Sequence, residues 1–248
     1  MSPDRSRSRP TIVLVHGAMS TSVMWDGVIG LLDHDALAVD LPGRRYKPAD
    51  LGTVTRADWI QSVCDDIEAA GLDDVVLVGH SLAGFVIPGV AARLDGRTRG
   101  LIFVTANVPA EGRPPVEFMR ADLRARTIEH HDAIVDRTSG RTLGGLRPGE
   151  PPIVTDLELV DDGPRLGLEA PGPLFEPFSW DGFPTHLPRT YIRCLRDTMI
   201  TPALVDTMVV NMGGAKLIDI DAGHNVATCA PAELSALLDA CAIEARSK

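Results

Sequence analysis

The chain has 248 residues, 44% of them hydrophobic, which is enough to bury a full core and favours one domain with an insertion. Its formal net charge of −10 disfavours nucleic acid and anionic membranes as partners, because both would be repelled by the protein's own field. No run reaches the roughly 18 apolar residues of a membrane span, and residues 1–10 are expected to be a polar, flexible leader without the apolar core of an export signal. The four cysteines are widely spaced and lack a CxxC pattern, which indicates reduced thiols and a cytoplasmic location. The sequence leaves open whether the chain is a monomer or a homodimer.

Short apolar runs, rich in β-branched residues, alternate along the chain with patterns of helical spacing. This alternation predicts an α/β fold with a mostly parallel central sheet of about six strands flanked by helices. The strands are expected at residues 11–15, 36–40, 75–78, 101–105, 190–195 and 216–220. Helices are expected at 56–70, at 116–134, and from Pro202 and Pro231 onward.

The sequence Gly-His-Ser-Leu-Ala-Gly at 79–84 lies between an expected strand and a helical pattern at 85–94. A strand that turns abruptly into a helix strains the residue at the turn and exposes its side chain above the sheet. Ser81 holds that position. Gly79 and Ala83 supply the small residues that the turn needs two positions before and after it, although the usual motif has glycine where Ala83 stands. The pattern predicts a nucleophilic serine, with a purely structural turn as the alternative.

A second loop supplies what a nucleophilic serine needs to act on a carbonyl group. The first expected strand ends in His16, Gly17, Ala18 and Met19. A loop at the carboxyl edge of a parallel sheet can present a backbone N–H, here that of Ala18. Together with the N–H of Leu82, it would form an oxyanion hole.

The acid and the base of a catalytic triad are expected later in the chain. Asp197 and His224 each follow an expected strand, so Ser81, Asp197 and His224 stand in the order typical of an α/β hydrolase. Asp219 lies within a strand, and Asp221 is too close in sequence to His224 to reach the far nitrogen of its ring. The acids that compete with Asp197 are Asp206, Asp219 and Asp221.

Four segments carry a resemblance to a known family: LVHGA at 14–18, VDLPG at 39–43, GHSLAG at 79–84 and AGHN at 222–225. In these the chain resembles the α/β-hydrolase superfamily, and within it the branch of plant methyl-ester esterases, the salicylate-binding esterase, hydroxynitrile lyases and their bacterial relatives. The resemblance covers roughly residues 11–109 and 188–241. It implies a hydrolase core at 11–108 and 188–248, with a cap inserted at 109–187.

The expected cap is rich in proline and glycine. A cap over the serine would exclude water and shape the substrate pocket, whereas the alternative is a flexible loop without a role in specificity. Besides the oxyanion loop, we expect the pocket to be lined by Met19, Asn107, Phe118, Phe175 and Phe178. Some relatives carry the acid after the strand that ends near Thr105, but no acid stands between 103 and 109.

No cofactor and no metal are predicted. The sequence has no G-x-G-x-x-G after a strand and no P-loop. The His-His-Asp run at 130–132 lacks the helical spacing of two histidines and the third ligand that zinc requires. His16 and His80 are expected to bond to backbone in their loops, and His34 is expected at the surface.

We therefore predict a serine hydrolase that cleaves a small to medium, largely apolar carboxylic ester or lactone through a triad and an acyl-enzyme. The expected partner is a small-molecule substrate. Hydroxynitrile lyases of the resembled branch have threonine at the position of Gly17 and lysine at that of Asn225, so both of their marks are absent. Two alternatives stay open: a C–C bond hydrolase or tailoring enzyme of secondary metabolism with the same triad, and a small-molecule receptor with little turnover.

Overall fold

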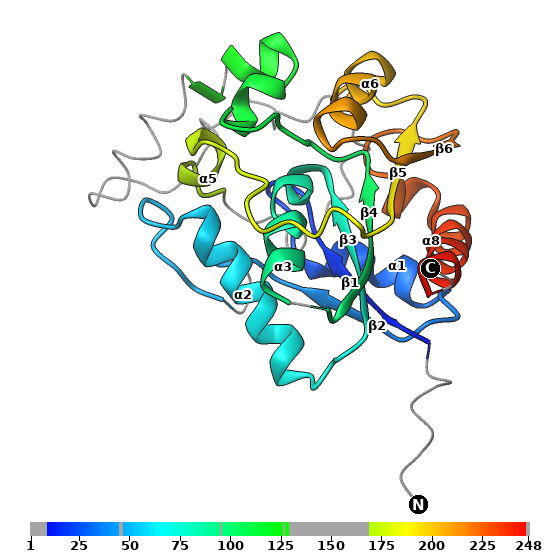
Figure 1. The fold of residues 1–248 in the computed structure, drawn as a ribbon. Helices are drawn as coiled ribbons and strands as arrows, with labels where there is room; N and C mark the ends of the chain where they lie inside the picture. The colour runs from blue at the N-terminus through cyan, green and yellow to red at the C-terminus, as the bar shows by residue number, and fades with distance from the viewer. Residues whose placement is uncertain (1–8, 45–46, 95, 126, 129–168, 247–248) are drawn as a thin grey trace, which may run out of the picture.

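The central sheet consists of six parallel strands in the order β2-β1-β3-β4-β5-β6 (Figure 1). The computed structural model describes residues 9–44, 47–94, 96–125, 127–128 and 169–246. The strands are β1 (Thr11–Val15), β2 (Ala36–Val39), β3 (Val75–His80), β4 (Thr98–Val104), β5 (Arg189–Cys194) and β6 (Lys216–Ile220). All six residues of β3 are buried, as expected for a central strand of a sheet covered on both faces.

Helices cover both faces of the sheet. The longer ones are α2 (Arg56–Ala69), α3 (Ile87–Arg93), α6 (Pro202–Asn211) and α8 (Pro231–Arg246). The short ones are η2 (Ser22–Trp25), α1 (Asp26–Ile29), η3 (Ser81–Phe85), η4 (Pro115–Phe118), α5 (Gly172–Phe175) and α7 (Val226–Cys229). Thr55 begins α2 with a capping box, in which its side chain and that of Asp58 each bond to the backbone N–H of the other residue.

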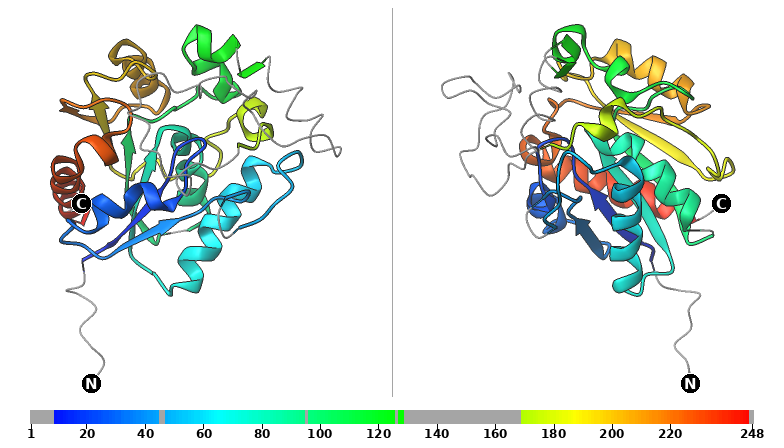
Figure 2. Two further views of the ribbon diagram at one scale, coloured as in Figure 1. Left: turned by 180° about the vertical axis from the view of Figure 1, so that it is seen from behind. Right: turned by 90° about the vertical axis from the view of Figure 1, so that its left-hand side faces the viewer.

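The alternation of side chains along each strand divides the interior into two cores. Val13 and Val15 of β1 point into one core, together with Trp59 of α2. Ile12 of β1 points into the other, together with Leu234 of α8. Figures 1 and 2 show the corresponding layers, with α1 and α8 on one face of the sheet and α2 and α3 on the other.

The strand order places a switch point between β1 and β3. From β1 the chain crosses to β2 at one edge, and from β3 it proceeds outward through β4, β5 and β6 to the other edge. At such a point the loops that leave neighbouring strands diverge and open a crevice at the carboxyl ends of the strands. The loops that follow β1 and β3 are those that carry Ala18 and Ser81.

The predicted fold class is confirmed, and the expected strands agree with the observed ones to within three residues at either end. The predicted helix at 116–134 is wrong in the part that the structure describes. The 3₁₀ helix η4 ends at Phe118, Met119 is extended, and helical structure resumes only at 121. Residues 129–134 of that expected helix lie outside the described residues. None of the helices in the described part of the chain is long and apolar enough to cross a membrane.

Candidate active site

Ser81 lies at the sharp turn between β3 and η3. Its φ of 51° is in the left-handed region, which L-residues other than glycine rarely adopt. The turn is tight because a Cβ on Gly79 would lie 3.0 Å from the carbonyl oxygen of Ala83, and one on Gly84 would lie 2.4 Å from that of Asn107. Gly79, which the sequence singles out for its small size, and Gly84 therefore allow close backbone contacts that hold the serine above the sheet.

The structure brings Ser81, His224 and Asp197 into one chain of hydrogen bonds. Nε2 of His224 lies 2.9 Å from Oγ of Ser81, and Nδ1 lies 2.7 Å from Oδ2 of Asp197. Because a carboxylate only accepts, Nδ1 carries the ring proton of a neutral His224, which leaves Nε2 to accept from the serine hydroxyl. Asp197 comes just after β5 and His224 just after β6, so parallel strands deliver both to the same edge of the sheet.

Besides His224, three other groups donate hydrogen bonds to the carboxylate of Asp197. Its Oδ1 accepts the backbone N–H groups of Met199 at 2.7 Å and Ile200 at 2.9 Å, and its Oδ2 also accepts the hydroxyl of Thr105. Burial raises the pKa of Asp197, but the hydrogen bonds from His224, Thr105 and Ile200 more than offset it, so the pKa lies below its ordinary value. The carboxylate is thus ionised at neutral pH and fixed in orientation. Sequence reasoning missed Thr105, whose only signal is a hydroxyl directly after a strand that ends at this edge.

The competing acids lie in other contacts. Asp219 pairs with Arg193 at 2.7 Å, and Asp221 pairs with Arg196 at 3.0 Å. Asp206 lies 3.6 Å from Arg193. All three are at least partly exposed, whereas Asp197 is 3% exposed. The geometry therefore favours Asp197 as the partner of His224.

The expected oxyanion donors are the backbone N–H groups of Ala18 and Leu82. In the described part of the chain, the N–H of Ala18 donates none of the backbone hydrogen bonds found outside helices and strands, and the N–H of Leu82 lies in the first turn of η3. His16 orients the peptide group that contains the Ala18 N–H. The N–H of Leu41 donates to Nε2 of His16 at 3.1 Å, so Nδ1 carries the proton and donates to the carbonyl of Gly17 at 2.8 Å.

The two motif histidines bond to backbone, as the sequence predicts. His80 donates from Nε2 to the backbone carbonyl of His224 at 2.9 Å and so fixes the loop that carries the base. Burial lowers the pKa of His80 to about 3, with His224 as a further cause, and burial with nearby Arg44 lowers the pKa of His16 to about 4. Both rings are therefore neutral at physiological pH.

The expected pocket residues fall into two groups. Asn107 is buried, its N–H donates to the carbonyl of Ser81 at 2.8 Å, and Met19 lies in the oxyanion loop. Phe118 and Phe175, in the neighbouring elements η4 and α5, are partly buried against the core. Phe178 is 1% exposed and packs edge-on against a tryptophan at 5.0 Å, so it is a core residue in this structure. Whether these side chains contact a substrate stays a prediction, and the His-His-Asp run at 130–132 lies outside the described residues.

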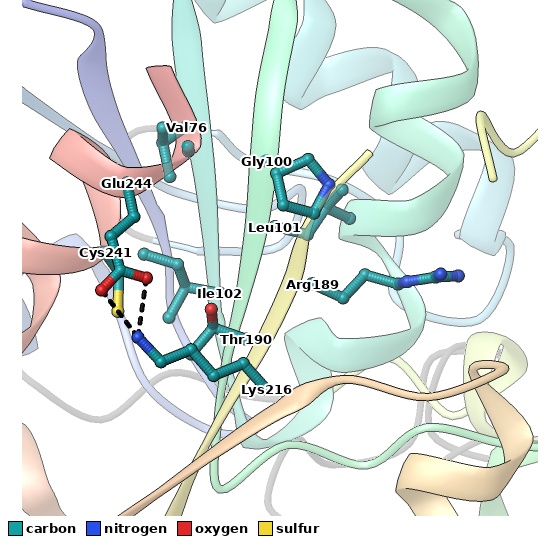
Figure 3. A pocket seen from close by; sticks show the side chains of 11 residues that line it. Val76, Gly100, Leu101, Ile102, Arg189, Thr190, Lys216, Cys241 and Glu244 are labelled. Atoms are coloured by element: carbon teal, nitrogen blue, oxygen red, sulfur yellow. Dashed lines mark hydrogen bonds and ion pairs between the residues drawn. The ribbon is translucent and has the colours of Figure 1, made fainter. Parts of the chain in front are cut away.

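A pocket elsewhere in the molecule holds none of the predicted site residues. It lies at the amino ends of β4, β5 and β6 against α8, and an ion pair between Lys216 and Glu244 crosses it (Figure 3). Its volume of about 130 Å³ is below the range of several hundred Å³ typical of small-molecule sites. The predicted site lies at the opposite, carboxyl edge of the same sheet.

A parallel sheet of this order, with a serine in a strained turn after the strand beside β1 and a histidine after the last strand, defines the class of α/β hydrolases. The comparison with protein families agrees, because the model of the alpha/beta hydrolase family matches residues 12–237. The chain belongs to this family. The predictions of family and of an enzyme of α/β-hydrolase type are thereby confirmed.

Curated relatives include several named esterases and hydrolases. A pyrethroid hydrolase of Sphingobium wenxiniae is 28% identical over 237 residues, covering 86% of this chain and 80% of the relative. A carbendazim hydrolyzing esterase of Nocardioides sp. is 38% identical over 110 residues, covering 40% of this chain and 43% of the relative. Methylesterase 17 of Arabidopsis thaliana is 23% identical over 270 residues, covering 98% and 95%.

Solved structures show the same fold at lower identity. An extracellular alpha/beta-hydrolase from a Paenibacillus species superposes with a TM-score of 0.76 at 23% identity and covers 92% of this chain and 97% of its own. The pyrethroid hydrolase PytH superposes with a TM-score of 0.72 at 23% identity and covers 94% and 98%.

Proposed function

We propose that this chain is a serine hydrolase of small to medium, largely apolar carboxylic esters or lactones. Ser81 is the nucleophile, His224 the general base and Asp197 the acid that orients it. The N–H groups of Ala18 and Leu82 form the oxyanion hole. The observation that carries the proposal is the continuous hydrogen-bond chain from the strained Ser81 through His224 to a buried, ionised Asp197.

The reaction follows from these roles. Nε2 of His224 takes the hydroxyl proton of Ser81 as Oγ forms a bond to the carbonyl carbon of the substrate, and the carbonyl oxygen becomes an oxyanion held by two N–H groups. The protonated His224 then gives its proton to the departing alkoxide, which leaves as the alcohol. Water attacks the acyl-enzyme with His224 again as base, and collapse of the second oxyanion releases the acid and restores Ser81.

The relatives support esters as the bond type. Several of them carry names that include esterase or methylesterase, and another is named as a hydrolase of pyrethroids. All four cysteines are free thiols, which supports the cytoplasm as the compartment.

A fluorophosphonate probe and a panel of p-nitrophenyl esters and lactones test the proposal. We expect the probe to attach to Ser81, wild-type protein to hydrolyse short apolar esters, and Ser81→Ala to lose both reactions while it unfolds at the same temperature. Labelling at another residue, or turnover by Ser81→Ala at the wild-type rate, would overturn the nucleophile.

A tailoring reaction on the same triad is the second candidate. It is favoured by a relative named norfluorocurarine synthase 2 of Strychnos sp, which is 26% identical over 248 residues and covers 90% of this chain and 91% of the relative. Probe labelling at Ser81 without turnover of any ester or lactone in the panel would favour this candidate over an esterase, and would equally fit a receptor.

Hydroxynitrile lyase chemistry is not expected. A Cβ on Gly17 would lie 2.7 Å from Nδ1 of His80 and 3.0 Å from Cβ of Ser81, so the threonine of the lyases does not fit this loop. Mandelonitrile should therefore not be cleaved above the uncatalysed rate. Cleavage that disappears in Ser81→Ala would contradict this.

A further inference from the structure

The loop that presents the Ala18 N–H contains a strained residue directly after it. Met19 has a φ of 54°, in the left-handed region that favours glycine. A methionine does not keep this conformation without outside contacts that hold it. The N–H of Ala18 belongs to the peptide group that it shares with Gly17, and the peptide group between Ala18 and Met19 fixes the other side of the Ala18 Cα. His16 fixes the preceding one through the carbonyl of Gly17.

The following peptide group is fixed by a carboxylate that is distant in sequence. Oε2 of Glu169 accepts the N–H of Met19 at 2.9 Å. Its Oε1 accepts Nη2 of Arg44 at 2.7 Å and the N–H of Ala170 at 3.0 Å. The carboxylate therefore has a donor on each oxygen, and its position is set by contacts other than the one with Met19.

Arg44, in the loop after β2, contacts both Glu169 and the loop that contains Met19. We refer to Glu169 and Arg44 together as the brace. The Nε of Arg44 donates to the carbonyl of Ser20 at 3.0 Å while its Nη2 holds Glu169. The side chain of Arg44 is fully buried and that of Glu169 is 11% exposed. A planar guanidinium with two donors engaged is rigid, and a buried pair of opposite charges does not separate readily into water. The two residues thus bind the loop at two successive positions. Glu169 accepts the N–H of Met19, and Arg44 donates to the carbonyl of Ser20.

We propose that Glu169 and Arg44 are positioning residues of the oxyanion hole, which hold the N–H of Ala18 in the direction that the developing oxyanion requires. This inference rests on the proposed serine hydrolase function. Neither side chain needs to touch the substrate. Because the oxyanion exists only in the transition state and the intermediates, loss of the brace should lower kcat and leave KM nearly unchanged.

The substitution Glu169→Gln tests the proposal, because an amide of the same shape cannot accept from both Met19 and Arg44 with its single oxygen. We expect kcat for the best ester of the panel to fall about 10- to 100-fold, below the roughly 10²- to 10³-fold loss that follows removal of an oxyanion donor itself. KM should stay within about twofold. Glu176→Gln is the matched control, since Glu176 also accepts a backbone N–H, that of Arg56, but away from this loop; its kcat should equal that of wild type.

The affinity for an aryl trifluoromethyl ketone is a measurement that a change in packing alone would not alter. This inhibitor forms a hemiketal with Ser81 and places its oxygen in the oxyanion hole. Its inhibition constant should rise in Glu169→Gln by the same factor by which kcat/KM falls, whereas the affinity for the product acid should not change. Arg44→Lys, which cannot hold Glu169 and Ser20 together, should show the same pattern with a smaller loss and serves if Glu169→Gln does not fold.

The outcomes separate this proposal from the one on which it rests. If wild-type protein hydrolyses esters through Ser81 while the folded Glu169 and Arg44 variants keep full kcat, the brace plays no part and the positioning proposal falls alone. A loss of kcat matched by a rise in KM, or without weaker ketone binding, would overturn it as well. If Ser81→Ala retains wild-type turnover, the proposed function itself falls.

Discussion

Asp197 accepts hydrogen bonds from two backbone N–H groups, one imidazole and one hydroxyl. Apart from the imidazole of His224, these donors are supplied by structure that the sequence order alone does not reveal. Thr105, the hydroxyl donor, has a φ of 36° and directly follows β4, a strand that is adjacent to β5 in the sheet. Its bond makes the acid one member of a fully satisfied network, in which loss of any donor leaves part of a buried charge exposed to apolar surroundings.

Replacing Thr105 by valine removes only that hydroxyl. We expect Thr105→Val to lower the free energy of unfolding by about 1–3 kcal/mol, because a buried carboxylate loses a partner. Thr98→Val is the matched control on the same strand, since the buried hydroxyl of Thr98 has no partner within the described residues, and its loss should be neutral or slightly stabilising. Urea unfolding at pH 7 measures both. Equal stability of the two variants would show that the Thr105 bond contributes nothing.

The three members of the proposed triad should act as a unit. Ser81→Ala and His224→Ala should each reduce kcat by up to about 10⁶-fold, and the double variant should be hardly worse than either. Asp197→Asn should cost on the order of 10⁴-fold, because the wrong tautomer of His224 is favoured. Asp219→Asn removes only a surface pair with Arg193 and should keep wild-type turnover. A large loss in Asp219→Asn together with an active Asp197→Asn would reverse the assignment of the acid.

Single residues were predictable where they stand in a motif and not where their partners are remote. Ser81 and His224 could be located because each follows a strand in a recognisable order. The link between Met19 and Glu169 spans 150 residues, and no periodicity points to it. The prediction that His34 lies at the surface is wrong. His34 is buried, and its Nδ1 lies 2.6 Å from a carboxylate oxygen of Asp239 on α8. A charged partner supplied by tertiary packing decides the burial of such a residue, and the local sequence contains no trace of it.

The turn from β3 into η3 and α3 depends on close backbone contacts. A methyl group at Gly84 would meet the backbone of Asn107, which cannot move aside as a side chain could. We expect Gly84→Ala to destabilise the protein by about 1–3 kcal/mol, as overpacking does, and to reduce labelling of Ser81 by the fluorophosphonate. Gly27→Ala in α1, where the nearest contact is 3.7 Å away, should instead be neutral or stabilising by about 0.5–1 kcal/mol. Thermal unfolding distinguishes them, and equal melting temperatures would contradict the tight-turn account.

Strands were more predictable than short helices. Apolar, β-branched runs mark the central strands because both faces of the sheet are buried there, as in β3, so composition alone identifies them. The helix expected at 116–134 is interrupted at its start because Pro114 and Pro115 confine the chain to a short 3₁₀ turn, after which Met119 is extended. The predicted helix at 85–94 begins later than expected, since the strained serine first enters a 3₁₀ turn. The division into core and cap stays a prediction.

Across the whole molecule, two buried neutral histidines make stability depend on pH. Both rings have a pKa in the folded state, about 4 for His16 and about 3 for His80, below the ordinary 6.5. The unfolded chain therefore binds more protons below pH 6.5, so stability is fully present above 6.5 and is lost as pH falls toward 4. His16 lies near Arg44, Asp40 and Lys47, and His80 near His224, Asp197 and His16.

At pH 5 the free energy of unfolding should be lower than at pH 8 by about 2 kcal/mol for each histidine, or about 4 kcal/mol for both together. The variant His80→Gln should lose about half of the dependence, whereas His186→Gln should keep it, because His186 is exposed. Urea unfolding in a pH series provides the measurement. A free energy of unfolding that is flat between pH 8 and pH 5 would contradict the neutral, buried state of both rings.

Three residues other than glycine in the described part of the chain have positive φ, and all three border the proposed site: Met19, Ser81 and Thr105. Glycine at position 19 would relieve the strain of Met19 at little steric cost, but it would also release the loop that carries Ala18. Glycine at position 105 would delete the hydroxyl that binds Asp197 and would therefore cost stability as well. Heat resistance and turnover therefore favour different amino acids at position 19. A variant library divided between a thermal challenge and an activity screen should diverge at position 19, with glycine enriched in the first population and methionine retained in the second, whereas threonine should be retained at position 105 in both.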